Sequence, residues 1–207
     1  MDAEDSKPVA EESVRGRLLV AAIALFNRKG YAPTTVREIV DAAGVTKPAL
    51  YYYFGSKEGI YLAILQESLA YFEGELQVAM ETEGSLRERL QRLAAKVYSL
   101  FRDHSEVVRL VHAVYYGPPQ GAPAFNVHRL HELLVEAIKR LVERGIASGE
   151  LRAGSVEDTT LALLGATNVC MELELAHPEM QVGETGLRRV LDVVFDGASP
   201  VVSRIGE

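Results

Sequence analysis

Apolar residues recur at three- and four-residue steps along nearly the whole chain. In the first such segment, Leu18, Ala22 and Leu25 follow this spacing, which is typical of a helix with one buried face. Gly30 follows, at a position where a helix needs a left-handed terminating residue. No stretch shows the sustained alternation of Val, Ile and Thr that indicates a strand. The pattern predicts an all-α protein.

Helix start and stop signals divide this pattern into about nine helices. Thr35 followed by Glu38 fits a capping box and predicts a short helix over residues 36–42. Thr46 can cap the next short helix, with Pro48 in the first turn, where a missing amide is harmless. Further signals predict helices over residues 57–80, 85–101, 105–117, 123–147, 155–177 and 185–195.

Charge is distributed unevenly over the 207 residues, whose net charge is -7. Residues 13–60 hold seven basic and three acidic side chains, whereas residues 1–12 hold five acidic side chains and one basic. A local positive field attracts a polyanion better than the total charge suggests, so the composition does not exclude nucleic acid. The lone Cys170 excludes an intrachain disulfide and fits a reducing compartment.

These observations predict four segments. Residues 1–12 are expected to form a mobile acidic tail, 13–55 a small helical domain, 56–197 a larger helical domain and 198–207 a C-terminal tail. The acidic start is the opposite of a signal peptide. No apolar stretch approaches the ~20 residues that span a bilayer. We therefore expect a cytoplasmic protein without a membrane partner.

Two short helices joined by a turn at Gly44, and preceded by an amphipathic helix, form a helix-turn-helix pattern. This spacing alone also fits many helical hairpins. The surrounding residues closely resemble the DNA-binding domain of the TetR family of bacterial repressors. The resemblance covers residues 21–65 and rests on Phe26, Gly30, Tyr31, Thr34, Thr35, Ile39, Ala43, Gly44, Val45, Leu50, Tyr51, Phe54 and Lys57.

A recognition helix needs an apolar inner side and an outer side that presents donors and acceptors. Val45, Ala49, Leu50 and Phe54 are expected to face the core. The resemblance implies that Tyr51 and Lys57 contact phosphates, while Thr46, Lys47 and Pro48 lie where base edges are read. The predicted DNA contacts are Thr35, Arg37, Thr46, Lys47, Pro48, Tyr51, Tyr52 and Lys57. As alternatives, the two threonines are only caps and Lys57 is only solvated.

For the C-terminal region, the resemblance implies a dimerisation domain with an inducer pocket. The last two helices would form the interface, the first from Thr159 to His177 and the second from Thr185 to Phe195. Small residues such as Gly165 allow close helix approach, although ordinary packing within the chain explains them equally well.

The middle helices carry side chains with apolar bodies and polar tips, which suit an aromatic or amphipathic effector. These candidates are Tyr98, Phe101, His112, Tyr115, Tyr116, Phe125 and His128, any of which can also be core. His128 and His131 are spaced for one helix face, but no Cys cluster or second histidine pair accompanies them, so we expect no metal and no cofactor.

The resulting hypothesis is a ligand-responsive transcriptional repressor. It binds a palindromic operator as a homodimer, and a small apolar or aromatic effector releases it. We expect no enzyme, because the sequence contains no HExxH, no P-loop and no paired-aspartate motif. The alternatives are a helical protein-interaction module, or a family member that activates transcription without a small-molecule ligand.

Overall fold

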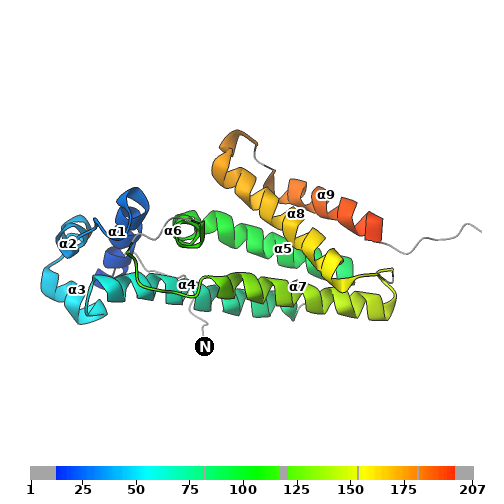
Figure 1. Cartoon of the computed structure of the whole chain (residues 1–207), viewed down its shortest axis with the longest axis horizontal. Coiled ribbons are helices and arrows are strands. Elements are labelled where there is room, and N and C mark those ends of the chain that lie inside the picture. Colours follow the sequence, from blue (N-terminus) through cyan, green and yellow to red (C-terminus); the bar gives the residue numbers. More distant parts are fainter. Residues whose placement is uncertain (1–12, 82, 117–120, 153, 181, 199–207) are drawn as a thin grey trace, which may run out of the picture. The chain divides into compact units, whose positions relative to one another are not determined.

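The computed structural model describes residues 13–81, 83–116, 121–152, 154–180 and 182–198, without the side chains of Tyr116, Leu175, Ala176, Pro178 and Ala198. Within these ranges it contains nine α-helices, one short 3-10 helix and no strand (Figure 1). The all-α prediction is confirmed. The helices are α1 (Val14–Lys29), α2 (Val36–Ala43), α3 (Lys47–Phe54), α4 (Lys57–Met80), α5 (Leu86–Asp103), α6 (Ser105–Tyr116), α7 (His128–Ser148), α8 (Val156–Ala176), η1 (Pro178–Met180) and α9 (Gly183–Ala198).

The chain forms two compact units. The N-terminal unit holds the described residues up to Tyr71 together with His104–His128, and the C-terminal unit holds Phe72–Asp103 and the described residues from Arg129 onward. The first part of α4 therefore belongs to one unit and its last part to the other. Helix α6 belongs to the N-terminal unit, although the division expected after residue 55 assigned it to the larger domain.

The core of the N-terminal unit is built from one face of each of its helices. Leu18 and Phe26 of α1, Ile39 of α2, Leu50 of α3 and Tyr61 of α4 are all buried in it. Burying a large apolar side chain contributes about 1.5–3 kcal/mol, so this shared core fixes the three N-terminal helices against the start of α4.

The core of the C-terminal unit joins α5, α7, α8 and α9. Leu93, Leu141, Leu187 and Leu191 are nearly inaccessible within it. A void among these helices measures only about 10 Å³, close to the smallest volume that holds one water molecule. The described core of this unit is therefore closely packed.

Residues 123–127 are not helical, so the predicted start of a helix at Pro123 is wrong. Helix α7 begins at His128, after a turn in which the Val127 amide donates to the Phe125 carbonyl at 3.0 Å. Proline suits the first turn of a helix, but it equally suits an irregular segment that makes no helical hydrogen bonds. Local sequence does not distinguish these two uses.

Candidate nucleic-acid interface

Local hydrogen bonds fix both the start of α2 and the turn between α2 and α3. The Thr35 hydroxyl accepts from the Glu38 amide at 3.3 Å, and Glu38 accepts from the Thr35 amide at 2.9 Å, which is the predicted capping box. Helix α2 ends at Gly44, whose φ of 64° is left-handed. The Val45 amide then donates to the Val40 carbonyl at 3.0 Å, as in a Schellman motif. This geometry sets the direction in which α3 begins.

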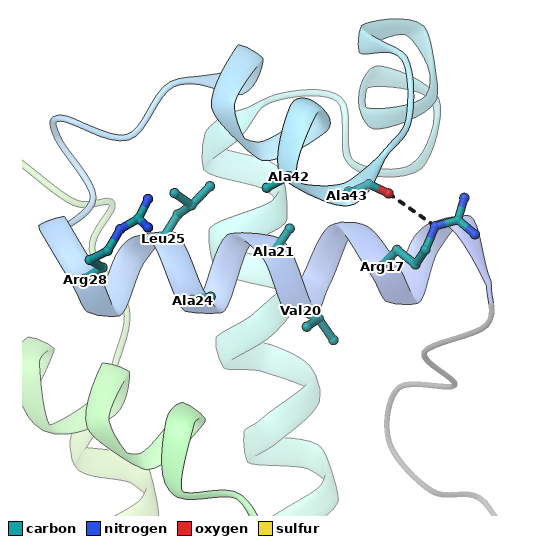
Figure 2. A pocket seen from close by; sticks show the side chains of 8 residues that line it. All are labelled: Arg17, Val20, Ala21, Ala24, Leu25, Arg28, Ala42 and Ala43. Atoms are coloured by element: carbon teal, nitrogen blue, oxygen red, sulfur yellow. Dashed lines mark hydrogen bonds between the residues drawn. The ribbon is translucent and has the colours of Figure 1, made fainter.

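A groove of about 430 Å³ runs between α1 and α2 (Figure 2). Apolar side chains such as Ala21 and Ala42 line it, together with Arg17 and Arg28. Arg17 Nε donates to the carbonyl of Ala43 at 3.2 Å, which ties α1 to the last residue of α2 (Figure 2). Sequence reasoning missed this link, because its partners lie 26 residues apart.

Helix α3 has the two-sided character expected of a recognition helix. Leu50 is fully buried, whereas Tyr51 is 51% and Tyr52 83% exposed. Lys47 and Pro48 are also exposed. Tyr53 is exposed as well, so α3 presents three tyrosine rings and one ammonium, groups that can contact phosphates and base edges.

The two candidate threonines differ. Thr35 at the start of α2 uses its hydroxyl in the capping box, while the hydroxyl of Thr46 makes no capping hydrogen bond with α3. Thr46 is exposed, and its hydroxyl is therefore accessible to an external partner. Arg37 extends from α2 with 80% of its side chain exposed, 3.6 Å from Asp41. An exposed pair of this kind contributes little and separates easily.

Lys57 is engaged within the N-terminal unit. Its ammonium donates to the carbonyls of Tyr31 at 3.0 Å, Ala32 at 3.3 Å and Thr34 at 2.9 Å. It also lies 4.1 Å from the centre of the Tyr31 ring. Burial, and to a smaller extent Lys29, lower the pKa of Lys57. The geometry favours a positioning role for Lys57, and the phosphate contact that the resemblance implies stays a prediction.

An ion pair joins the end of α1 to the start of α2. Lys29 Nζ lies 2.5 Å from a carboxylate oxygen of Glu38. The hydrogen bond from Lys29, followed by those from Thr35, lowers the pKa of Glu38 to about 2. Glu38 was predicted only as half of the capping box, since nothing local to its sequence position indicates Lys29.

The family profile for bacterial regulatory proteins of the tetR family matches residues 18–64, which contain most of α1, all of α2 and α3, and the start of α4. Residues 18–64 therefore form an N-terminal domain of the tetR family type. The predicted resemblance is therefore confirmed, and it coincides with the helix-turn-helix that the structure builds.

Curated relatives extend the match beyond this domain. The HTH-type transcriptional activator FasR of Mycolicibacterium smegmatis is 34% identical over 131 residues, 63% of this chain and 59% of FasR. The HTH-type transcriptional repressor KstR2 of the same organism is 34% identical over 102 residues, 49% of this chain and 50% of KstR2. The alignments thus span only one half to three fifths of these TetR-family relatives.

Solved structures match over most of the chain. The ketosteroid transcriptional regulator KstR2 of Mycobacterium tuberculosis gives a TM-score of 0.71 at 23% identity, covering 91% of this chain and 96% of that one. FadR from Bacillus subtilis, in complex with stearoyl-CoA, gives 0.65 at 20% identity, covering 87% and 97%. At these identities the likeness concerns the fold, which the C-terminal helices also follow.

The predicted effector residues fall in both compact units. In the C-terminal unit, Tyr98 is buried and its hydroxyl donates to Glu174, while Phe101 is half-buried against the core. Burial, followed by the bond to Glu174, raises the pKa of Tyr98. The hydroxyl of Tyr98 is thus used in a hydrogen bond within the C-terminal unit.

In the N-terminal unit, the ring of Tyr115 lies 4.8 Å from that of His128, and His112 is half-buried. Phe125 lines a cleft of about 850 Å³, whereas the Tyr116 side chain lies outside the described residues. That all seven line one pocket remains a prediction. The cleft itself was not predicted, since its walls come from four separate segments.

No group of three or more His, Cys, Asp or Glu side chains that could hold a metal ion occurs in the described part of the chain. Among the same residues, no helix is long and apolar enough to cross a membrane.

Proposed function

We propose that the chain is a transcriptional regulator that binds double-stranded operator DNA through α3. The observation that carries this proposal is the exposed face of α3, where Thr46, Lys47 and Tyr51 present hydrogen-bonding groups while Leu50 anchors the helix in the core. Lys47 and Thr46 read base edges, and Tyr51 and Tyr52 contact the phosphate backbone. Thr35, the cap of α2, and Arg37 of α2 are exposed and lie on the phosphate side.

Charge supports this assignment. Residues 13–60 carry four more basic than acidic side chains within a chain whose total is -7. The positive charge is thus concentrated in the segment that builds the helix-turn-helix, where it steers DNA toward α3. Since operator DNA is cytoplasmic in bacteria, the regulator acts there.

The regulator works as a homodimer through α8 and α9. Leu161 and Val169 on α8 and Val193 on α9 are 67%, 55% and 75% exposed within the single chain. Exposed apolar side chains on adjacent helices indicate a surface that a second copy covers. The dimer doubles the contact with DNA, so the operator is an imperfect palindrome.

The interface uses only part of the apolar stripe predicted for α9. Leu187, Leu191 and Phe195 are buried in the core of their own unit, whereas Val190 and Val193 remain exposed. A helix packed on α5 and α8 with one side leaves its other side for the partner. The outer valines, rather than Leu191, are therefore the positions at which to test dimerisation.

Regulation is by repression, released by a small apolar or aromatic effector. KstR2 is named a repressor, and FadR was solved with stearoyl-CoA, a molecule with a long apolar chain. Activation is the second candidate, because FasR is named an activator. The two differ in whether transcription from the bound promoter falls or rises when the regulator is added.

Selection of bound duplexes from a random pool tests DNA binding and returns the operator. Enrichment of one inverted-repeat sequence is expected, and its affinity should fall steeply with salt. Lys47→Ala should change base preference, while the matched control Lys139→Ala, in the C-terminal unit, should not. A pool without enrichment, and no salt-sensitive binding, would instead favour the protein-interaction module.

A further inference from the structure

A cleft of about 850 Å³ lies in the N-terminal unit between the end of α1, Tyr61 of α4, helix α6 and residues 121–125. We call it the α1–α6 cleft. Its volume falls within the range of about 300–1,000 Å³ that is typical of small-molecule sites. The DNA-binding face of α3 contributes none of its lining residues.

The wall of the α1–α6 cleft is aromatic and apolar. The Tyr31 ring lies 5.6 Å from that of Phe26 and 4.8 Å from that of Tyr61, and Leu110 and Phe125 complete the wall. Phe26, Tyr61 and Leu110 are almost completely buried, so the surrounding core holds this surface in place. Such a wall accepts a flat or chain-like apolar body.

The charged side chains that line the same cleft are positive on balance. Arg109 and Arg28, which also lines the groove between α1 and α2, line the cleft and are exposed, and neither forms an ion pair with any described residue. Glu106 also lines the cleft, where its carboxylate accepts from Asn27 Nδ2 at 2.9 Å, so the two guanidinium groups outweigh the acidic side chain by one charge. Two free guanidinium groups beside an apolar wall are suited to a carboxylate, sulfonate or phosphate on the ligand.

From this arrangement we infer that the α1–α6 cleft binds an amphipathic organic anion, with its apolar body against the Tyr31 wall and its charged group on Arg28 and Arg109. The inference rests on the proposed function for its regulatory part and names the class and the site of the effector. It differs from the pocket predicted in the middle helices, with which it shares only Phe125.

Tyr31 connects the cleft to the helix-turn-helix. Its ring is part of the cleft wall and also lies under the Lys57 ammonium, which holds the carbonyls of Tyr31 and Thr34. Thr34 directly precedes Thr35, the cap of α2. A ligand that shifts the Tyr31 ring therefore acts on the segment that positions α2 and α3, and it favours one conformation of that segment.

Two fluorescent probes with the same aromatic body test the site on the full chain. Anilinonaphthalene sulfonate is the anion, and N-phenylnaphthylamine is its neutral counterpart. Arg28→Gln and Arg109→Gln should each weaken the anion about 2- to 5-fold and leave the neutral probe unchanged. The control Arg144→Gln, at an exposed position of α7 outside the cleft, should change neither. Val114→Trp should weaken both probes about tenfold or more by filling the cleft.

The site is overturned if the arginine variants and Val114→Trp bind both probes as the wild type does, while circular dichroism shows that each variant is folded. Saturating anion should also weaken operator binding about 5- to 150-fold in the wild type and less in Arg109→Gln. Anion binding without any effect on the operator overturns the connection through Tyr31. If no duplex is bound at all, the proposed function fails, and the probe titrations still decide the cleft.

Discussion

Replacing Lys57 by Met removes the ammonium while it keeps an unbranched side chain of similar length. Three carbonyl acceptors lose their shared donor, and the Tyr31 ring loses a cation at 4.1 Å. A hydrogen bond to a charged group contributes about 1.5–3 kcal/mol, and a cation over a ring about 0.5–1 kcal/mol. Lys57 is half-buried, so water partly replaces these contacts. We expect the free energy of unfolding to fall by about 2–3 kcal/mol in total.

Urea titration followed by circular dichroism measures this loss, and hydrogen exchange locates it. Amides at the start of α2 should exchange faster in Lys57→Met, since the carbonyls of Tyr31, Ala32 and Thr34 lie just before its cap. Lys47→Met is the matched control, because Lys47 is exposed and has no hydrogen-bond or ion-pair partner among the described residues. It should change stability by less than about 0.5 kcal/mol.

The positioning role is refuted if Lys57→Met is as stable as Lys47→Met and α2 exchanges at the wild-type rate. Operator binding separates this role from the phosphate contact. Removing a residue that neutralises one phosphate reduces the slope of log affinity against log salt concentration by about one unit. If Lys57 only positions residues 31–34, Lys57→Met lowers the affinity for the operator and leaves the salt slope unchanged.

Five further variants test three other features of the structure. The pKa of Glu38 in the folded chain is about 2, so the stability that its carboxylate contributes is lost as the pH falls from about 4.5 toward 2. Glu38→Gln should therefore be less stable than the wild type above pH 4.5. Its free energy of unfolding should also depend less on pH below that value. Thr35→Ala should cost about 1 kcal/mol in urea titration, whereas Thr46→Ala, whose hydroxyl caps nothing, should cost less than about 0.5 kcal/mol and alter operator preference instead. Val193→Asp should give monomers in sedimentation while the fold is retained, whereas Leu191→Asp, at a 2% exposed position, should unfold the C-terminal unit. The interface is contradicted if Val193→Asp stays dimeric, and the internal position of Leu191 is contradicted if Leu191→Asp is stable. Equal losses of stability for Thr35→Ala and Thr46→Ala would contradict the difference in capping. An unaltered acid limb in Glu38→Gln would contradict the contacts of Glu38.

The sequence was sufficient where one short segment contains both partners of an interaction. Thr35 and Glu38 are three residues apart, and both capping bonds formed as expected. Gly44 supplies a left-handed residue at the end of α2, which its position in the pattern also indicated. These features need no knowledge of the tertiary fold, because helix geometry alone brings their groups together.

Sequence was insufficient where the partner is distant or where one residue type serves two roles. The acceptors of Lys57 lie 23–26 residues before it, so the resemblance alone supplied a role for this side chain. Pro123 fits a helix start and an irregular segment equally well. The apolar stripe of α9 did not reveal that Leu191 is internal and Val193 exposed, since this depends on which side α5 and α8 cover.

The α1–α6 cleft and Lys57 give the N-terminal unit a means of responding to a ligand within itself. An effector changes operator affinity only by its difference in affinity for two conformations, typically about 1–3 kcal/mol. The contacts of Lys57 with the 31–34 segment are of this size. A ligand that competes with the ammonium for the Tyr31 ring can therefore shift the start of α2 without unfolding the core around Phe26 and Tyr61. Binding is reciprocal, so saturating operator must weaken the anion by the same factor by which the anion weakens the operator.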